Sequence, residues 1–423
     1  MLSLLGRGFR AFRSRAFRAI WLSYVVGQAG FWVSNVSLQW LVLRLTNGDS
    51  FHQGLLFFFN FIPILLFSPL GGLMADRLNR KRLAVFSQLG ISAVAGLLSI
   101  VSALGLDRLA TVYSFAFAFG ILLAIAGPVG QALVANSVTK EDISSAVSLQ
   151  SVGINLSRVA GPALAIPILL TAGPAPAFAG YSIAALVTSG LLSRVRITLS
   201  SAQYPASGWW RDLRGGFDHA SERHPALIVL SLVAVSSMTL SSYVALLPIF
   251  AYGVLGQGPS GFGGLVIATG VGAGVGAFMT GMIEGRIRLA QSAGLMIALA
   301  GALVALAASR NYIASIAAAA LAGGFNFALM TTLSSSLQQL VDDSRRGRVM
   351  SLYLISWGGL VPIGGLLIGL LATVASPTIA VVSFACIGAV YGAAIAYRHR
   401  GERIPSTLAG PAAETSSASD SLS

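Results

Sequence analysis

Two features of this sequence carry charge where charge is otherwise rare. The first is the segment 76–82, DRLNRKR, which stands between two long apolar segments. A carboxylate at a helix boundary attracts nearby guanidinium groups and a facing helix N-terminus. Such a contact can hold in one conformation and break in another, so we predict a gate formed by Asp76, Arg77 and Arg80. The alternative is a basic loop that only orients the chain in a membrane.

The second feature is Arg158, the one charged residue near the middle of an apolar segment. A charge at the bilayer centre is costly unless it faces a partner or water, and it marks a functional site by default. No acidic residue lies centrally in any segment to pair with it. Asn155 lies one helical turn earlier and is placed to orient it. Two interpretations stay open: Arg158 binds an anionic group of a substrate, or it links helices and supports their movement.

The composition places both features in a membrane protein. Of the 423 residues, 55% are hydrophobic and only 10% are charged, whereas soluble domains contain about 25% charged residues. The net charge of +13 is dispersed in short clusters, so nucleic acid is not an expected partner. Cys386 is the only cysteine, so no intrachain disulfide can form.

Twelve apolar segments are long enough to cross a bilayer. They lie near residues 19–44, 53–75, 83–105, 110–135, 145–172, 175–193, 226–252, 261–283, 289–309, 312–338, 348–374 and 377–397. If each segment crosses, all but four Lys and Arg residues fall on the side of the two termini; the exceptions are Arg44, Arg108, Arg158 and Arg310. Positive charge collects on the cytoplasmic side, so we predict both termini there.

The chain divides into two halves of six segments. We predict an N-terminal half at 1–193, a cytoplasmic linker at 194–225, a C-terminal half at 226–400 and a disordered cytoplasmic tail at 401–423. A shift of 203 residues lays Gly161 on Gly364 and Ser148-Leu149 on Ser351-Leu352. Parallel halves of this kind are typical of transporters that hold their substrate between the halves at mid-membrane.

Several blocks, in the right order, resemble the exporter branch of the major facilitator superfamily, the transmembrane secretion effectors that include enterobactin exporters and macrolide efflux proteins. The blocks are FRAIWL at 17–22, LQWLV at 38–42, the 76–82 loop, GPAL at 161–164 and GRVMSLY at 347–353. The resemblance covers nearly the whole chain. It implies an all-α membrane protein of twelve transmembrane helices in two six-helix halves that works by alternating access.

The resemblance also implies roles for individual residues. Asp76 and Arg77 would hold the cytoplasmic side closed in the outward-facing state, against the eleventh segment near Gly347. Asn79 stands where many members have glycine, and asparagine tolerates the left-handed turn expected there. Gly161 and Pro162 resemble the antiporter signature of the fifth helix, where they would allow close packing and helix bending. Ordinary packing by small residues is the alternative.

A cavity between the halves would be lined by the first, fourth, seventh and tenth segments, as the resemblance implies. The candidate liners are Gln28, Trp32, Asn35, Gln39, Trp40, Gln131, Tyr243, Asn326 and Phe327. Amides mixed with aromatic rings suit an amphipathic ligand of medium size. Each amide is equally suited to a hydrogen bond between helices.

Energy coupling departs from what the resemblance implies. A proton-coupled antiporter needs a titratable group that faces each side in turn, yet no Asp, Glu or His lies mid-segment. Asp76, Glu284 or the substrate itself would have to carry the proton. The sequence contains no phosphate-binding loop, catalytic triad or metal-ligand spacing, so we predict no catalytic residue, metal or cofactor.

We therefore predict a monomeric secondary transporter in a bacterial-type inner membrane, exporting a siderophore, an antibiotic or a similar amphipathic compound. The expected partners are the lipid bilayer, a small-molecule substrate and, as coupling ion, protons. An importer of an anionic metabolite is the main alternative. A non-transporting scaffold or sensor is a weaker one, because such a protein typically adds a sizeable soluble domain.

Overall fold

A computed structural model describes residues 9–195, 217–218, 224–282, 289–341 and 346–399. Within these ranges the chain is helical and contains no strand. The long helices are α2 (Arg15–Leu45), α3 (Ser50–Arg77), α4 (Arg80–Ala103), α5 (Leu109–Ala135), α6 (Ile143–Thr171), α7 (Pro174–Arg194), α9 (His224–Thr239), α11 (Pro259–Met282), α12 (Leu289–Ala308), α13 (Tyr312–Leu340), α14 (Arg346–Val374) and α15 (Pro377–Arg398).

Each predicted segment overlaps one of these helices, and most boundaries differ by only a few residues. Among the described residues, eleven spans are long and apolar enough to cross a membrane. The remaining helix, α2, is 31 residues long and includes buried serines, Asn35 and Gln39 in its second half. The predicted all-α membrane fold of twelve helices is confirmed. The predicted linker at 194–225 and tail at 401–423 lie almost entirely outside the described residues, so these two domain assignments stay predictions.

The seventh span is broken rather than continuous. After α9 the chain passes through η3 (Ser242–Leu246), α10 (Leu247–Ile249) and the π-helical turn η4 (Phe250–Val254). The hydroxyls of Ser236 and Ser242 donate to the carbonyls of Leu232 and Met238 at 2.6 and 2.8 Å. Serine side chains of this kind compete with the backbone ladder and bend helices. The segment predicted at 226–252 lies within one apolar span, Pro225–Val254, whose helix is interrupted after Thr239.

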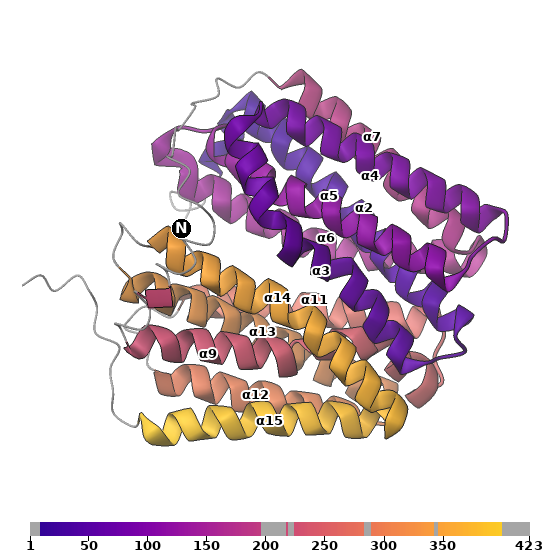
Figure 1. Cartoon of the computed structure of the whole chain (residues 1–423), viewed down its shortest axis with the longest axis vertical. Coiled ribbons are helices and arrows are strands. Elements are labelled where there is room, and N and C mark those ends of the chain that lie inside the picture. The colour runs from indigo at the N-terminus through magenta and orange to yellow at the C-terminus, as the bar shows by residue number, and fades with distance from the viewer. Residues whose placement is uncertain (1–8, 196–216, 219–223, 283–288, 342–345, 400–423) are drawn as a thin grey trace, which may run out of the picture.

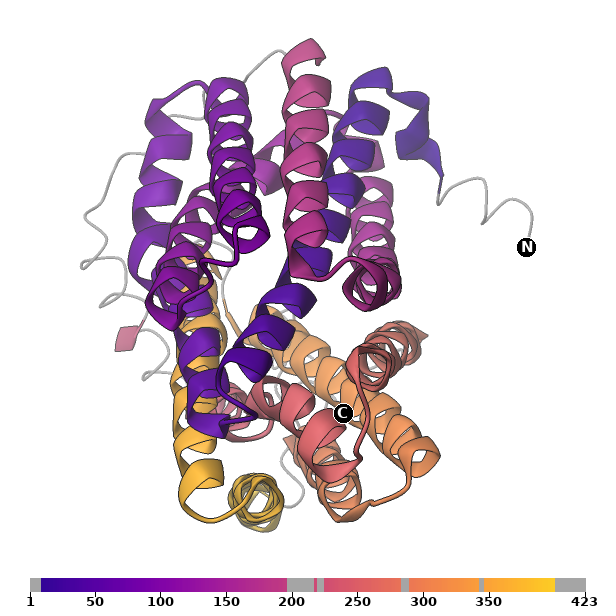
Figure 2. The same ribbon diagram turned by 90° about the vertical axis from the view of Figure 1, so that its right-hand side faces the viewer.

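The helices form two bundles that meet along a limited surface. Figure 1 shows α2 to α7 as one bundle and α9 to α15 as the other, and Figure 2 shows the same division after a quarter turn. Two buried apolar clusters lie within the first bundle, and the largest cluster joins the second bundle to residues of the first such as Trp40 of α2. Between the bundles, α3 packs on α14 and α6 packs on α11.

The two ends of the bundles differ in how closely they approach. We call the end that holds the turns at 46–49, 104–108, 172–173, 255–258, 309–311 and 375–376 the α2–α3 end, and the opposite end the α3–α4 end. A Cβ on Gly54 of α3 would lie 2.5 Å from the carbonyl oxygen of Gly365 in α14. Nearer the α3–α4 end, a glycine of the same helix, Gly71, instead approaches Ala124 of its own bundle. The described close contacts between bundles thus run from the α2–α3 end to mid-helix.

At the α3–α4 end, Asn79 does not adopt the left-handed conformation expected from the sequence. Its backbone is extended, with φ −64° and ψ 108°, and its side-chain oxygen accepts from the N–H of Arg82 at 3.1 Å. Asparagine is a favoured N-cap because its oxygen satisfies an orphan donor of the first turn. The residue therefore starts α4, and the left-handed turn was a wrong expectation.

Candidate substrate site between the two bundles

Arg158 lies at the middle of α6 and touches both bundles. Its guanidinium carbon is 5.4 Å from the ring centroid of Trp32 in α2 and 4.3 Å from that of Phe327 in α13. A guanidinium within about 6 Å of an aromatic centroid is attracted by the ring face. One cation is thus held between a ring of the first bundle and a ring of the second.

Two glycines and a proline shape the surroundings of Arg158. A Cβ on Gly270 of α11 would lie 3.1 Å from Cγ of Arg158, so a larger residue would crowd the side chain. Gly161 lets α2 approach α6 at Trp32, because any Cβ there would collide with the Cβ of the tryptophan. Pro162 has no N–H to donate to the carbonyl of Arg158, four residues earlier. The predicted close packing at Gly161 is seen, whereas bending at Pro162 stays a prediction.

The guanidinium is short of hydrogen-bond acceptors. Its Nε is buried without a hydrogen-bond partner, and the described residues offer the side chain neither a hydrogen bond nor an ion pair. Tyr24 of α2 and Tyr243 of η3 lie close enough to interact with it electrostatically, and the buried hydroxyl of Tyr243 lies near the side chain of Thr269. Buried polar groups left unsatisfied are costly. The guanidinium of Arg158 therefore keeps a buried donor that no acceptor among the described residues satisfies.

Two predicted amides border this group. Gln28 donates through Nε2 to the hydroxyl of Tyr24 at 3.1 Å, which connects it to the surroundings of Arg158. Asn326 precedes Phe327 and accepts from Oγ of Ser241 at 2.9 Å. That bond ties α13 to the break after α9, so Asn326 links helices beside the site.

Asn155 does not orient Arg158 through a hydrogen bond, contrary to the sequence-based expectation. Its Nδ2 donates at 2.9 Å to the carbonyl of Ser151 in the same helix, and its Oδ1 is buried without a partner among the described residues. The nearest cross-helix bond is instead that of Ser157, whose Oγ donates to the carbonyl of Val25 at 3.1 Å. Ser157 thus fixes α6 against α2 next to the arginine.

Asn35 and Gln39 belong to a separate polar group inside the first bundle. Gln39 donates to Oδ1 of Asn35 at 2.7 Å, and Gln53 of α3 donates to the carbonyl of Gln39 at 2.8 Å. A cavity of about 10 Å³ lies beside Asn35 and Asn60, which is near the smallest space that holds one water. These amides connect helices rather than line the space around Arg158. Gln131 of α5 is exposed, and no described contact brings it to Arg158.

The predicted gate is only partly described. Helix α3 continues to Arg77, but the side chains of Ala75, Asp76 and Arg77 lie outside the described residues. Arg80 begins α4, is half-buried and makes an interaction. The gate therefore stays a prediction.

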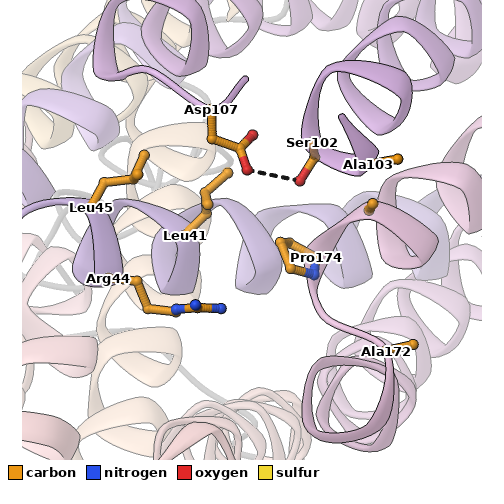
Figure 3. A pocket seen from close by; sticks show the side chains of 9 residues that line it. Leu41, Arg44, Leu45, Ser102, Ala103, Asp107, Ala172 and Pro174 are labelled. Carbon is orange, nitrogen blue, oxygen red and sulfur yellow. Dashed lines mark hydrogen bonds between the residues drawn. The ribbon is translucent and has the colours of Figure 1, made fainter. Parts of the chain in front are cut away.

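The larger of two described cavities lies elsewhere, at the α2–α3 end of the first bundle (Figure 3). It measures about 420 Å³ and opens between α2, the end of α4 and the turn before α7. Arg44 and Asp107 face it from different elements, and Ser102 donates to Oδ2 of Asp107 at 3.1 Å. None of its lining residues contributes to the group around Arg158.

Sequence reasoning missed two members of the Arg158 group, Tyr24 and Gly270. Tyr24 stands four residues before Gln28, and this helical spacing was the available signal. Gly270 begins a run of alternating glycines in which every member looked alike; of these, Gly272 and Gly276 approach α13 and Gly274 faces open space. Only the packing distinguishes Gly270 from them.

Comparison with known proteins supports the transporter interpretation. The family model described as transmembrane secretion effector matches residues 7–415. The staphyloferrin A transporter of Staphylococcus aureus is 24% identical over 348 residues, covering 82% of this chain and 86% of that protein.

Solved structures share the fold at low sequence identity. A bacterial homologue of the human lysosomal transporter Spinster has a TM-score of 0.70 at 16% identity, covering 93% of this chain and 98% of the other. A D-xylose–proton symporter has a TM-score of 0.69 at 14% identity, covering 89% and 96%. With the two-bundle architecture, these findings show that the chain belongs to the transmembrane secretion effector family of major facilitator transporters and is a multi-pass secondary transporter of small molecules.

Proposed function

We propose that this protein exports an amphipathic small molecule with an anionic group, of the siderophore or antibiotic type, across a bacterial inner membrane. The observation that carries the proposal is the guanidinium of Arg158, held between Trp32 and Phe327 of opposite bundles with its Nε unpartnered. A carboxylate or a similar anion supplies the missing acceptors. Because the cation is not already paired with an acid, binding does not have to break an ion pair.

The direction of transport rests on the description of the family, because importers and exporters both pass through a state that is open to the cytoplasm. With both termini in the cytoplasm, as the positive charge predicts, the α2–α3 end faces outward and the α3–α4 end faces the cytoplasm. The described close contacts between bundles then seal the outer side, and the site takes its substrate from the cytoplasm. Rocking of the bundles about Arg158 would release the substrate outside. The description of the family as secretion effectors supports export.

The staphyloferrin A transporter supports a siderophore as the substrate class, although its identity of 24% leaves the compound itself a proposal. The import of an anionic metabolite would use the same arginine and the same movement. Direction and compound are therefore tested together.

The test uses inside-out membrane vesicles that contain the full chain. Staphyloferrin A, enterobactin and erythromycin are added outside, and the compound retained after filtration is measured by mass spectrometry. We expect accumulation of at least one compound above the empty-vector level and its loss in Arg158→Gln, with Arg158→Lys intermediate because lysine keeps the charge but not the planar fork. Arg44→Gln, in the separate cavity, is the matched control.

Equal retention in wild-type and empty-vector vesicles would contradict export of these compounds. Accumulation only in right-side-out vesicles would contradict export as the direction. Full activity of Arg158→Gln would show that the arginine does not bind the substrate.

A further inference from the structure

The α2–α3 end contains a hydrogen-bonded contact that joins the two bundles. Asp49 caps α3, because its Oδ1 accepts from the N–H of Phe51 at 2.8 Å. The same Oδ1 accepts from Oγ1 of Thr373, in the last turn of α14, at 3.0 Å, and this hydroxyl shares its one proton with the carbonyl oxygen of Gly369, 3.1 Å away. The N–H of Phe51 also donates to Oγ1 of Thr373 at 2.9 Å. We call this contact between Asp49, Phe51 and Thr373 the outer latch.

The outer latch lies beside a close crossing of the two helices. A Cβ on Gly369 of α14 would fall 2.7 Å from the carbonyl oxygen of Ser50 in α3. Helices that approach this closely cannot separate at that end unless the hydrogen bonds to Thr373 break. In a transporter that alternates, the outer latch is therefore a contact of one state only.

His52 lies beside the outer latch and forms a titratable pair with Asp49. Its Nδ1 lies 2.8 Å from the hydroxyl of Tyr113 in α5, and its Nε2 lies 3.8 Å from Oδ2 of Asp49. The side chains of His52 and Asp49 are 29% and 34% exposed, so protons reach them. If the tyrosine donates to Nδ1, the ring proton sits on Nε2 and faces Asp49. A second proton on Nδ1 is then accommodated by turning the tyrosine hydroxyl.

No other charged side chain among the described residues forms an ion pair or a hydrogen bond with His52 or Asp49. The last turns of α14, from Gly365 to Val374, contain no titratable residue. Arg108 precedes α5 and is exposed, Arg44 of α2 is exposed, and Tyr252 of η4 packs beyond Gly48. The tyrosine of η3, Tyr243, belongs to the Arg158 group. His52 and Asp49 thus dominate the electrostatics of the outer latch.

We propose that His52, Asp49 and Tyr113 form a proton-binding site, and that a proton bound there loosens the outer latch. With His52 neutral, the hydroxyl of Thr373 donates to a full carboxylate charge, and such charge-assisted bonds are the stronger ones. With His52 protonated, the imidazolium shares that charge and the bond to Thr373 weakens. Both side chains are about a third exposed in the closed state, so water already hydrates their charges. The ion pair of His52 with Asp49 therefore stabilises the closed state less than the weaker bond to Thr373 destabilises it.

This inference rests on the proposed alternating access and names a proton site for it. Histidine is the side chain that ordinarily changes charge between pH 5 and 8. Acid outside the cell would therefore favour the outward-open state, in which the substrate is released. Linkage is reciprocal, so opening of the outer latch must favour proton binding by the same factor. The sequence has no mid-membrane acid that could sense the proton gradient. This site senses the gradient in its place, and it does not itself carry the proton across.

The test measures the distance across the α2–α3 end in the purified full chain. Spin labels are placed by Leu104→Cys and Ile313→Cys, in a Cys386→Ser background, because these positions are exposed on opposite bundles at that end. Pulsed dipolar spectroscopy is recorded between pH 5 and 8 without added substrate. We expect the ratio of long to short distances to rise roughly three- to ten-fold on acidification, as expected for loss of a charge-assisted bond.

Variants distinguish the role of His52 in the pH response from the role of Thr373 in closing the outer latch. His52→Gln should keep the high-pH ratio throughout, and Thr373→Val should raise the long-distance population at every pH. His399→Gln, which changes a histidine remote from the outer latch, should behave as wild type. The proton site alone would be overturned if His52→Gln kept the pH response of the wild type. It would also be overturned if the wild type responded to pH with the opposite sign, or if its two distance populations did not respond to pH. A single short distance in every variant, Thr373→Val included, would overturn alternating access and the proposed function with it.

Discussion

The two bundles use the same packing position for different purposes. Gly161 of α6 and Gly364 of α14 are related by the 203-residue shift, and each sits where another helix comes too close for a side chain. In the first bundle that helix is the continuous α2, and a cation, Arg158, stands three residues before the glycine. In the second it is the broken element after α9, and Val361 occupies the corresponding position. The repeat therefore conserves the crossing of helices, whereas the chemistry belongs to one bundle.

The largest expected effect comes from moving the cation between the bundles. In the double variant Arg158→Val with Val361→Arg, the charge keeps its depth but loses Trp32 and Phe327 as neighbours. We expect vesicle transport to fall by roughly 100-fold, as when an interaction needed for turnover is removed. Arg158→Val alone is the reference, and size-exclusion chromatography checks that both variants remain folded. Transport by the double variant well above this reference would mean that a cation in either bundle suffices.

The paired glycines provide the next largest effect, now on stability. A Cβ at Gly364 would meet the carbonyl oxygen of Met238 and the hydroxyl of Ser242, and one at Gly161 would meet Cβ of Trp32 and the carbonyl oxygen of Ala29. A carbonyl oxygen or a Cβ cannot move unless its helix moves, so Gly364→Ala and Gly161→Ala should each cost about 1–3 kcal/mol for overpacking. Thermal unfolding in detergent measures both.

Gly274→Ala is the control for these alanine variants, because no atom outside its own helix lies within 4 Å of a Cβ placed there. It should unfold at or slightly above the wild-type temperature, since alanine favours a helix over glycine. An equal loss of stability in all three variants would show that helix propensity, rather than the crossings, decides the outcome.

The sequence was sufficient for the features that stand out against their background. Arg158 and Gly161 are recognisable because a charge and a Gly-Pro pair are unusual within an apolar span. The break after Thr239 was not recognisable, because hydropathy stays high across it and the serines that cause it also occur in continuous helices. Asp49 and His52 lie outside the predicted apolar segments, and the contact of Asp49 with Thr373 joins positions more than 300 residues apart. Gly270 differed from its neighbours only through what faces it.

The two rings around Arg158 test whether the bundles contribute equally to the site. Phe327 lies closer to the guanidinium than Trp32 does, at 4.3 against 5.4 Å. Each of Phe327→Leu and Trp32→Leu should weaken retention of the transported compound by roughly three- to thirty-fold, as for loss of a desolvated cation–π contact. The effect of Phe327→Leu should be the larger of the two. Apparent KM and maximal rate are measured in vesicles. A change in the maximal rate alone would assign the rings to movement rather than to binding.

The smallest effect is expected at the α3–α4 end, which lies away from the described glycine contacts between α3 and α14. Asp76 is predicted to help close this end in the outward-facing state, in which Asp76→Asn would lose an attraction to basic groups while keeping the size of the side chain. We expect transport to fall only two- to five-fold, roughly the value of one exposed charged contact. Arg82→Gln, which removes charge from the same loop, is the control and should leave transport nearly unchanged. If both variants lose the same activity, the loop acts through its total charge; if only Asp76→Asn does, a specific contact closes the cytoplasmic end as Thr373 closes the other.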